Sequence, residues 1–490
     1  MITGNRRKRI AIFCDGTWCG RETNTFSNVI TLASMVGEIQ WDTQPGVSPT
    51  KVHPIKTNHP DTIAGYQEGV GLNKTFLEYI WDGTTGSTIA EECIEVYRFI
   101  VDHFTQDHEI WLFGLSRGAY IVRCVAGMIN NCGIIKARSN PEETTILCEK
   151  IYQIYRSPLE VDKPHSDACK DFRKDANAVW QTDTPPVKFM GLFDTVGGLG
   201  IPRINAGVGF DWPEFYDQEV STSVEKVYHA CSLHDRLWIF QPCLAFDSDQ
   251  RKNCPKTPEK HFEIHQQWFP GVHYDLGRQT FRFVRQSPSN TLEKWLGAIP
   301  DQLAKSIHPN HVLADLVLTW MLSAIKTHDG GNLLIPNIQQ HIWTVNGRIV
   351  KPSHPQPLGP TGSGDVYGNV LEYAPAGGIW SPLVSVGSRV TGVFNRIAPN
   401  LGDNIQDLLG VKTLLRIVTA TRDRRVPGGR IPGGQGDVFD YKKAVELEVG
   451  EGELRSVNIG VNGRVDEKRY PSKTFEGWQL WRNVFGRYPL

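Results

Sequence analysis

The chain alternates between short apolar runs and stretches in which apolar residues recur at helical spacing. Residues 110–113 are apolar and follow the polar residues 106–109, which indicates a buried strand. Beyond residue 116 the apolar positions keep a helical period as far as Gly133, a residue suited to end a helix. The pattern therefore predicts a strand, a sharp turn and a helix. The apolar helical positions are Ala119, Ile121, Val122, Val125, Ala126, Met128 and Ile129.

Further elements of both kinds flank this unit. Residues 9–14 and 187–193 are predicted to be buried strands, and residues 311–326 carry the apolar stripe of an amphipathic helix. Thr88 and Glu91 have the spacing of a capping box, which places the start of another helix there. Strands that alternate with helices favour an α/β fold with a mostly parallel, doubly wound sheet and helices on both faces.

The amino-acid composition of the chain changes beyond about residue 335. Residues 352–360 and 427–434 are rich in proline and glycine and are typical of long loops. With 490 residues the chain exceeds the roughly 250–300 residues that one core supports. We therefore predict a first domain over residues 1–335 and a carboxy-terminal extension over residues 336–490, which either packs on the first domain or caps its site.

Charge and cysteine content narrow the classes of partner. The 52 basic and 53 acidic residues nearly cancel, so the chain lacks the electrostatic signature of a nucleic-acid-binding protein. Basic residues 6–9 are either a short localisation signal or, as we favour, the solvated end of the first strand. No apolar run reaches the about 18 residues of a membrane span, and no signal-peptide pattern occurs. Because the ten cysteines lack paired spacing, we expect a cytoplasmic protein with reduced thiols.

The turn between the strand and the helix carries candidate chemistry. Residues 114–118 read Gly-Leu-Ser-Arg-Gly, the Gly-x-Ser-x-Gly pattern of a nucleophile elbow. The two glycines lack a Cβ atom, so strand and helix can pack closely while Ser116 stands on a strained turn with its hydroxyl exposed. Such a short pattern also occurs by chance, but the flanking strand and helix supply the context that the elbow requires. We interpret Ser116 as a nucleophile.

A serine nucleophile requires a base and an acid, which this class of fold supplies later in the chain. Asp194 directly follows the predicted strand 187–193, at the sheet edge where open α/β sheets collect functional groups. His273 lies in a loop between two glycines and would take the Ser116 proton while Asp194 orients the imidazole. The alternatives are His229 and His234 for the base and Asp235 and Asp275 for the acid.

The loop after the first strand is the candidate oxyanion hole. Residues 15–18 read Asp-Gly-Thr-Trp, and the backbone N–H of Gly16 or Thr17 would bind the oxyanion. The second donor would be the backbone N–H of Arg117, the residue after the nucleophile. An ordinary turn is the alternative, because Asp-Gly forms turns readily. A dehalogenase-type phosphatase is excluded, because Phe13 stands where its nucleophilic aspartate would be.

Phosphate-loop and metal chemistry find little support in the sequence. Residues 69–75 resemble a phosphate-binding loop, but Asn73 replaces the glycine before the lysine and no strand is predicted before the motif. The chain contains neither a His-Glu-x-x-His motif nor a paired Cys-x-x-Cys motif, so no zinc site is expected. We expect an enzyme without a metal or other cofactor.

These pieces together resemble a known family, the α/β-hydrolase family of type VI secretion phospholipase effectors (the Tle1-like catalytic domain), formerly a domain of unknown function and common in fungi. The resemblance spans about residues 9–335 and implies a hydrolase of lipid or other carboxylic esters with Ser116, Asp194 and His273 as its triad. Residues 278–280 read Arg-Gln-Thr where family members usually have a run of glycines. The matching segments are residues 13–18, 68–71, 97–100, 113–120, 191–197, 229–230 with Arg236, 268–275 and 318–322.

The motifs and the resemblance predict a serine hydrolase that cleaves lipid or phospholipid acyl esters through an acyl-enzyme. The alternative is a catalytically silent hydrolase fold that serves as a binding protein, and an amidase, peptidase or thioesterase would use the same triad. The 14 Trp, 14 Tyr and 21 Phe residues suit contact with lipid, although most of them will belong to the core. We expect an acyl-binding cleft lined by residues 335–425 and the Trp18 loop, and at most transient contact with a membrane surface.

Overall fold

The fold is known from a computed structural model, which describes residues 7–21, 25–41, 50–69, 85–196, 221, 223–232, 235, 242–245, 263–269, 272–279, 281–282, 306–307, 309, 311–331, 333–350 and 437–438. Within these residues nine strands form one sheet, and a separate short pair is formed by β9 (Phe281–Arg282) and β10 (Ser306–Ile307). The strands of the sheet are β1 (Lys8–Cys14), β2 (Gly37–Ile39), β3 (Val52–Thr57), β4 (Thr62–Gln67), β5 (His108–Leu115), β6 (Val187–Phe193), β7 (Val224–Ser232), β8 (Glu263–Phe269) and β11 (Asp437–Val438).

The order of strands in the sheet is β11-β8-β7-β6-β5-β1-β4-β3-β2. Neighbouring strands from β11 to β4 are parallel, while β3 and β2 continue the sheet in antiparallel pairs. The predicted α/β fold with a mostly parallel sheet is therefore confirmed, with an antiparallel margin on one side.

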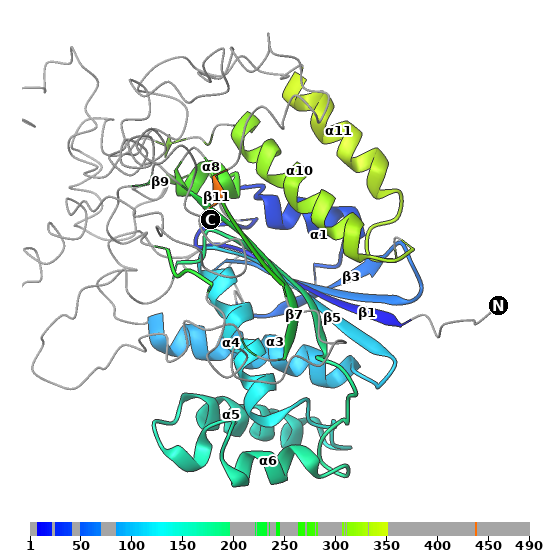
Figure 1. Ribbon diagram of the computed structural model, residues 1–490, viewed down its shortest axis with the longest axis vertical. Helices are drawn as coiled ribbons and strands as arrows, with labels where there is room; N and C mark the ends of the chain where they lie inside the picture. Colours follow the sequence, from blue (N-terminus) through cyan, green and yellow to red (C-terminus); the bar gives the residue numbers. More distant parts are fainter. Residues whose placement is uncertain are drawn as a thin grey trace, which may run out of the picture.

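Helices cover both faces of the sheet (Figure 1). One face is covered by α3 (Thr85–His103) and α4 (Arg117–Cys132), on whose outer side α5 (Pro141–Arg156) and α6 (Asp167–Lys174) pack. The other face is covered by α1 (Asn28–Val36), α10 (His311–His328) and α11 (Ile338–Val350). The short helix α8 (His273–Gly277) contacts α1 and α10. The stop predicted at Gly133 is confirmed, because α4 ends at Cys132 and Gly133 has φ 73°.

The central strands are buried on both faces, as their continuous apolar sequences predict. In β1, Ile10 and Ile12 face the core under α3 and α4, whereas Ala11 and Phe13 face the core under α1 and α10. Successive side chains of a strand point to opposite sides, so a sheet with helices on both faces needs apolar residues at both sets of positions.

A row of aromatic rings crosses the sheet on the α1 and α10 face. Phe13 of β1 stacks on Phe113 of β5 with ring centroids 4.9 Å apart. Phe189 of β6 stacks on Trp111 of β5 and on Tyr228 of β7, with centroids 5.0 and 5.2 Å apart. Cross-strand pairs of this kind favour one register, so the row helps to bring the carboxyl ends of four neighbouring strands to the same edge.

The strand order reverses its direction between β1 and β5. The chain leaves β1 toward the β2–β4 side of the sheet, and β5 then lies on the opposite side of β1. Open α/β sheets bind ligands at such a point of reversal. Asp15 follows β1, Ser116 follows β5 and Asp194 follows β6, so the topology brings the predicted site residues to this edge.

Two local predictions are wrong. Thr88 does not cap a helix, because α3 begins at Thr85 and Thr88 already lies in its first turn. A strand does precede the motif at Gly69, since β4 ends at Gln67. That strand has no simple alternation of apolar and polar residues, because it is buried along most of its length and contains a glycine. Residues 70–84 lie outside the described residues.

The basic cluster at residues 6–9 is not a fully solvated end, as Arg9 shows. Its side chain is buried and its Nε lies 3.1 Å from Oδ1 of Asp329, while a terminal guanidinium nitrogen lies 3.2 Å from the Glu109 carboxylate. A buried arginine needs such partners, because its charge is costly to remove from water. Arg9 therefore joins β1 to β5 and to the end of α10.

Helix α11, which the sequence pattern does not predict, begins just beyond residue 335. Its apolar residues Ile338, Ile342, Val345 and Ile349 belong to the same core as α1 and α10. The division of the chain at residue 335 and the carboxy-terminal extension stay predictions, since most of residues 336–490 lie outside the described residues. The scattered apolar residues and the loops predicted there lie outside them as well.

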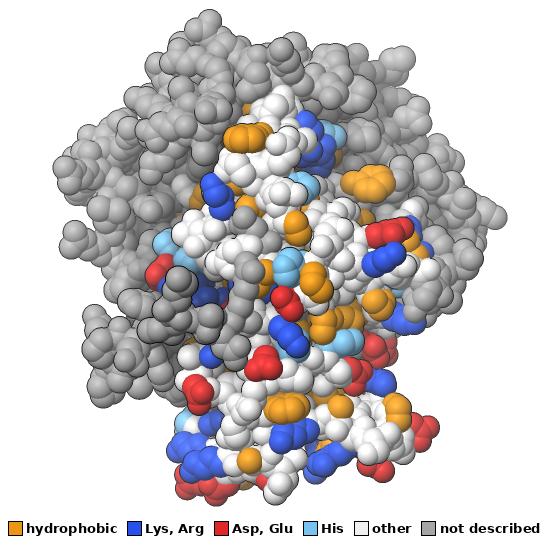
Figure 2. Space-filling model, turned by 90° about the vertical axis from the view of Figure 1, so that its right-hand side faces the viewer, with side chains coloured by type: hydrophobic (Ala, Val, Ile, Leu, Met, Phe, Trp, Pro, Cys, Tyr) orange, Lys and Arg blue, Asp and Glu red, His pale blue; other side chains and the backbone are white. Residues whose placement is uncertain are grey.

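The surface agrees with the balanced composition. Acidic and basic side chains are interspersed over the described part of the face shown in Figure 2. None of the helices in the described ranges is both long and apolar enough to span a membrane. The nine cysteines among the described residues are buried thiols.

Candidate active site

Ser116 lies at the sharp turn between β5 and α4. Its backbone has φ 56° and ψ −117°, a left-handed conformation that strains any residue with a side chain. Close packing accounts for the glycines on either side. A Cβ atom at Gly114 would lie 2.5 Å from the α4 backbone, and one at Gly118 would lie 2.1 Å from the carbonyl oxygen of Cys14. This is the geometry of a nucleophile elbow.

Asp194 follows β6 and is completely buried. Its Oδ1 accepts the backbone N–H of Ser232 at 2.9 Å, and its Oδ2 accepts the Ser232 hydroxyl at 3.1 Å. Oδ2 also lies 2.6 Å from Nδ1 of His273. Because a carboxylate can only accept, Nδ1 carries a proton and Nε2 is the basic nitrogen of the neutral imidazole.

His273 is the first residue of α8 and is 1% exposed. Its backbone N–H donates to Oδ2 of Asp235 at 2.9 Å, and Oδ2 of Asp275 accepts the backbone N–H of Val272 at 2.9 Å. The two carboxylates named as alternative acids therefore bind backbone groups around the histidine. Asp194 binds the imidazole itself.

His229, the alternative base, lies inside the sheet on β7. Its Nε2 accepts the backbone N–H of Thr195 at 3.2 Å, so its proton is on Nδ1, which lies 2.9 Å from Oε1 of Gln266. Both ring nitrogens are thus engaged with neighbours in the fold, which indicates a structural role. His234 lies outside the described residues.

The Asp15 carboxylate is the centre of a buried network at the predicted oxyanion loop. Its Oδ1 accepts the backbone N–H of Gly16 at 2.8 Å, and its Oδ2 accepts the hydroxyls of Ser27 at 2.6 Å and Tyr66 at 2.7 Å. Burial raises the pKa of the Asp15 carboxyl from 3.8 to about 6, although these hydrogen bonds lower it. Since Asp15 engages the Gly16 N–H, Thr17 is the better placed of the two predicted donors.

Arg117 supplies the other predicted donor and begins α4. The first N–H groups of a helix have no partner within the helix and carry the positive end of its dipole. An anionic oxygen beside Ser116 would therefore meet a favourable potential. The Arg117 side chain is itself buried, and this burial lowers the pKa of its guanidinium to about 9.

Helix α8, which carries the imidazole, is held by α1 and α10. The Asn28 side-chain amide donates to the carbonyls of Leu276 at 2.7 Å and Ala314 at 2.9 Å. Arg278 ends α8 with φ 56°, and its guanidinium donates to Asp315 at 2.7 Å. Glycine adopts this left-handed conformation without strain. Here an arginine takes the position and forms an ion pair with α10.

The structure thus brings Asp194 and His273 together at the edge that holds the Ser116 elbow. Among the hydrogen bonds of the described residues there is none between the Ser116 hydroxyl and the His273 imidazole. Nor do the described residues contain three or more His, Cys, Asp or Glu side chains grouped so as to hold a metal ion. The part of the predicted acyl-binding cleft beyond residue 350 lies outside them.

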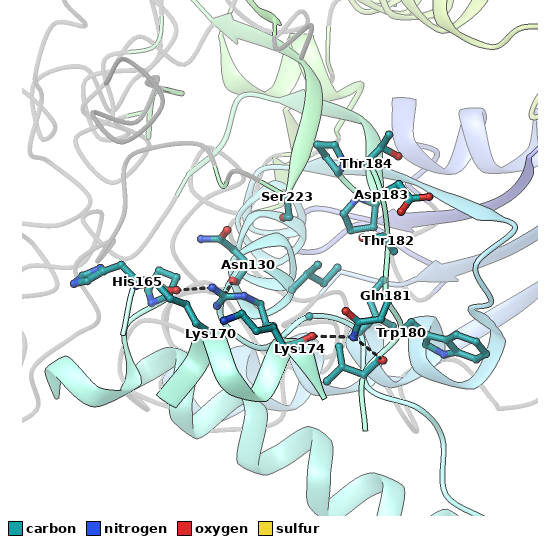
Figure 3. A pocket seen from close by; sticks show the side chains of 18 residues that line it. Asn130, His165, Lys170, Lys174, Trp180, Gln181, Thr182, Asp183, Thr184 and Ser223 are labelled. Carbon is teal, nitrogen blue, oxygen red and sulfur yellow. Dashed lines mark hydrogen bonds between the residues drawn. The ribbon is translucent and has the colours of Figure 1, made fainter. Parts of the chain in front are cut away.

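A pocket of about 640 Å³ lies at the opposite edge of the sheet (Figure 3). Its lining includes Pro186 and Ser223, which precede β6 and β7, together with Lys170 and Lys174 of α6. Because β6 and β7 are parallel, their amino ends lie at the edge away from Asp194. This pocket is not part of the site around the elbow.

Comparison with known proteins agrees with the fold. The family profile described as "T6SS, Phospholipase effector Tle1-like, catalytic domain" matches residues 8–324. The chain belongs to the family of Tle1-like phospholipase effector catalytic domains. Over 197 residues it is 27% identical to the uncharacterized protein YEL023C of Saccharomyces cerevisiae, a match that covers 37% of this chain and 27% of the yeast protein.

Two solved structures are also similar to this Tle1-like chain. A Tle1 effector bound to the VgrG spike of the type VI secretion system is 17% identical, with 57% of this chain and 52% of that chain covered and a TM-score of 0.26. An uncharacterized protein from Pseudomonas aeruginosa is 14% identical, with 66% of this chain and 46% of that chain covered and a TM-score of 0.31. The chain spans about a quarter of the yeast relative and about half of these two structures.

Several residues that build the site carry no motif of their own in the sequence. Ser232 orients Asp194, Asn28 holds α8, and Asp235 holds the histidine backbone. Ser232 ends β7 and Asp235 follows it. Functional groups of open α/β sheets collect at the carboxyl ends of the strands, and this rule, which selects Asp194, also indicates these two residues. Asn28 has no comparable signal, because its contacts depend on how three helices pack.

Proposed function

We propose that the protein is a serine hydrolase that cleaves carboxylic esters through an acyl-enzyme, with Ser116, His273 and Asp194 as its triad. The observation that carries the proposal is the buried His273–Asp194 hydrogen bond of 2.6 Å, at the same sheet edge as the strained Ser116 turn. A histidine whose Nδ1 is held by a buried carboxylate presents a basic Nε2, which is what an activated serine requires.

The reaction follows from the roles that these groups suit. The Ser116 hydroxyl attacks the ester carbonyl carbon and gives its proton to Nε2 of His273, while Asp194 stabilises the imidazolium through Nδ1. The backbone N–H groups of Thr17 and Arg117 bind the oxyanion. The imidazolium then protonates the leaving alcohol, and water activated by the same imidazole hydrolyses the acyl-enzyme.

The substrate we propose is a lipid, and more narrowly a phospholipid acyl ester. Membership of a phospholipase effector family supports this class of substrate. The chemistry of the triad itself is the same for short and long acyl groups, so the substrate preference must come from the surface around the elbow.

The test is a substrate panel with wild type and Ser116→Ala. We expect hydrolysis of p-nitrophenyl esters to rise with acyl length, with phospholipid vesicles also cleaved, and Ser116→Ala to lose at least about 1,000-fold in kcat. Unchanged turnover by Ser116→Ala would refute the triad. A sharp preference for acetyl esters would refute the lipid substrate but leave an esterase.

A further inference from the structure

The side chain of Gln279 reaches from the end of the histidine helix to the predicted oxyanion loop. Its Nε2 donates to the carbonyl oxygen of Thr17, across 262 positions of sequence. Gln279 is 2% exposed, and its own backbone N–H is bound to the Tyr274 carbonyl at 2.9 Å. The donor is thus anchored on the helix that carries His273.

The orientation of the Gln279 amide follows from its partner. A backbone carbonyl can only accept a hydrogen bond, so the nitrogen of the amide and not its oxygen must face Thr17. An apolar side chain of the same size would leave the Thr17 carbonyl without this donor inside the protein. A carboxylate would place two acceptors against each other.

Two further backbone groups of the loop are also engaged. The Gly16 N–H donates to Asp15, and the Gly16 carbonyl accepts the N–H of Cys19 at 2.9 Å. The Thr17 carbonyl is bound to Gln279, whereas the Thr17 N–H has no partner among the described residues. The next residue, Trp18, has φ 59°, so the loop is held in a strained conformation.

We propose that Gln279 is a positioning residue, which aims the Thr17 N–H at the oxyanion by holding the Thr17 carbonyl. The proposal rests on the function proposed above. Two peptide groups flank the Thr17 Cα atom. One contains the Thr17 carbonyl, which Gln279 holds, and the other contains the Thr17 N–H, so holding the first restricts the orientation of the second. The hydrogen bond from the Gly16 N–H to the Asp15 carboxylate holds the part of the loop that precedes Thr17. Because the Gln279 backbone is tied to α8 through the Tyr274 carbonyl, the oxyanion donor and the general base on α8 are positioned relative to each other.

The test compares wild type, Gln279→Met and Gln279→Glu at pH 8. We expect Gln279→Met to lower kcat by about 10- to 100-fold with KM within two-fold, because oxyanion donors act mainly in the transition state. Gln279→Glu should lose more, since its carboxylate repels the Thr17 carbonyl. Affinity for a trifluoromethyl ketone, whose hemiketal oxygen occupies the oxyanion hole, should fall by the same factor as kcat/KM.

Thr62→Val is the matched control. The Thr62 hydroxyl is also buried and donates to a backbone carbonyl, that of Leu333 at 2.7 Å, but it lies at the amino end of β4. We expect it to lower the thermal midpoint without changing kcat by more than two-fold. If Gln279→Met does not fold, Gln279→Asn, which keeps the amide but shortens its reach, replaces it.

The outcomes separate this proposal from the one on which it rests. Loss of stability in the Gln279 variants with kcat and ketone affinity both within two-fold of wild type would overturn the positioning role. A wild type that neither turns over esters nor binds the ketone would overturn the hydrolase function instead.

Discussion

The two edges of the central sheet are built differently. At the carboxyl edge, residues other than glycine adopt left-handed backbone conformations, and a buried carboxylate has a raised pKa. At the amino edge the strands are joined by ion pairs, among them Lys188–Glu225 at 2.8 Å and Lys226–Glu263 at 2.6 Å. The left-handed residues of the carboxyl edge are Trp18 after β1, Ser116 after β5, Asp194 after β6 and Arg278 after α8.

Four of the five left-handed residues other than glycine in the described ranges thus lie at the carboxyl edge, and the fifth is Asn337 before α11. Strained backbone persists only when the surrounding structure holds it, and it collects where chemistry requires an unusual geometry. None of the proposed triad lies at the amino edge, although a pocket of about 640 Å³ is found there. The cluster of left-handed residues and the buried Asp15 carboxyl, whose pKa is raised, therefore mark the candidate site at the carboxyl edge.

The largest effect expected from this comparison is on catalysis at the carboxyl edge. Asp194→Asn keeps the shape of the side chain but removes the charge that supports the His273 imidazolium, so kcat should fall by about 1,000- to 10,000-fold. Steady-state kinetics on a p-nitrophenyl ester measure this. Glu225→Gln, which weakens an ion pair at the amino edge, should leave kcat within two-fold of wild type, and equal losses in the two variants would contradict the division between the edges.

The next effect should appear in stability at the amino edge. Asp329→Asn removes the charge that faces Arg9, and breaking a buried ion pair of this kind costs about 3 kcal/mol. Thermal unfolding should show a lower midpoint, while kcat below that midpoint stays within two-fold of wild type. A variant with unchanged midpoint and reduced turnover would reverse the expected roles of the two edges.

Asp15 gives a smaller effect that depends on pH. Its pKa is raised from 3.8 in the unfolded chain to about 6 in the fold, so between these values the folded protein binds more protons and its stability falls as pH rises. Asp15→Asn removes this contribution. The stability of the variant relative to wild type should therefore increase by roughly 1.5 kcal/mol between pH 5 and pH 7.5. Denaturant titrations at both pH values measure it. A constant difference would show that folding leaves the pKa of Asp15 unchanged, and a difference of opposite sign would show that folding lowers it.

The smallest effect is expected in the pocket at the amino edge. Lys170→Ala with Lys174→Ala removes two of its cations, which lie on the partly exposed surface of α6. Ester turnover and its dependence on acyl length should stay within two-fold of wild type. A change in acyl preference would mean that this pocket takes part in substrate binding.

Much of the central fold is predictable from the sequence because it depends on local patterns. The strand, turn and helix around Ser116, the strand before Asp194 and the helix at 311–326 all follow from apolar periodicity and glycine positions. The glycines of the elbow are required by close packing, so their presence in the sequence carries real structural information.

What the sequence does not indicate depends on contacts between distant segments. Arg9 belongs to an apparently solvated basic cluster, and only its contacts with Asp329 and Glu109 explain its burial. The choice among Asp194, Asp235 and Asp275 likewise needs the position of α8, since all three lie close to the same edge. No sequence pattern singles out Gln279. Its role becomes apparent only from its contact with the loop at residues 15–18.

The most direct test of the account is to map the residue that a fluorophosphonate modifies in the folded wild-type protein. Peptide mass spectrometry should locate the adduct on Ser116, and Ser116→Ala with an unchanged thermal midpoint should remain unlabelled. His273→Ala, which removes the base, should slow labelling by at least about 100-fold. An adduct on another residue, or no adduct on a folded wild type, would contradict the claim that the strained turn after β5 holds the nucleophile.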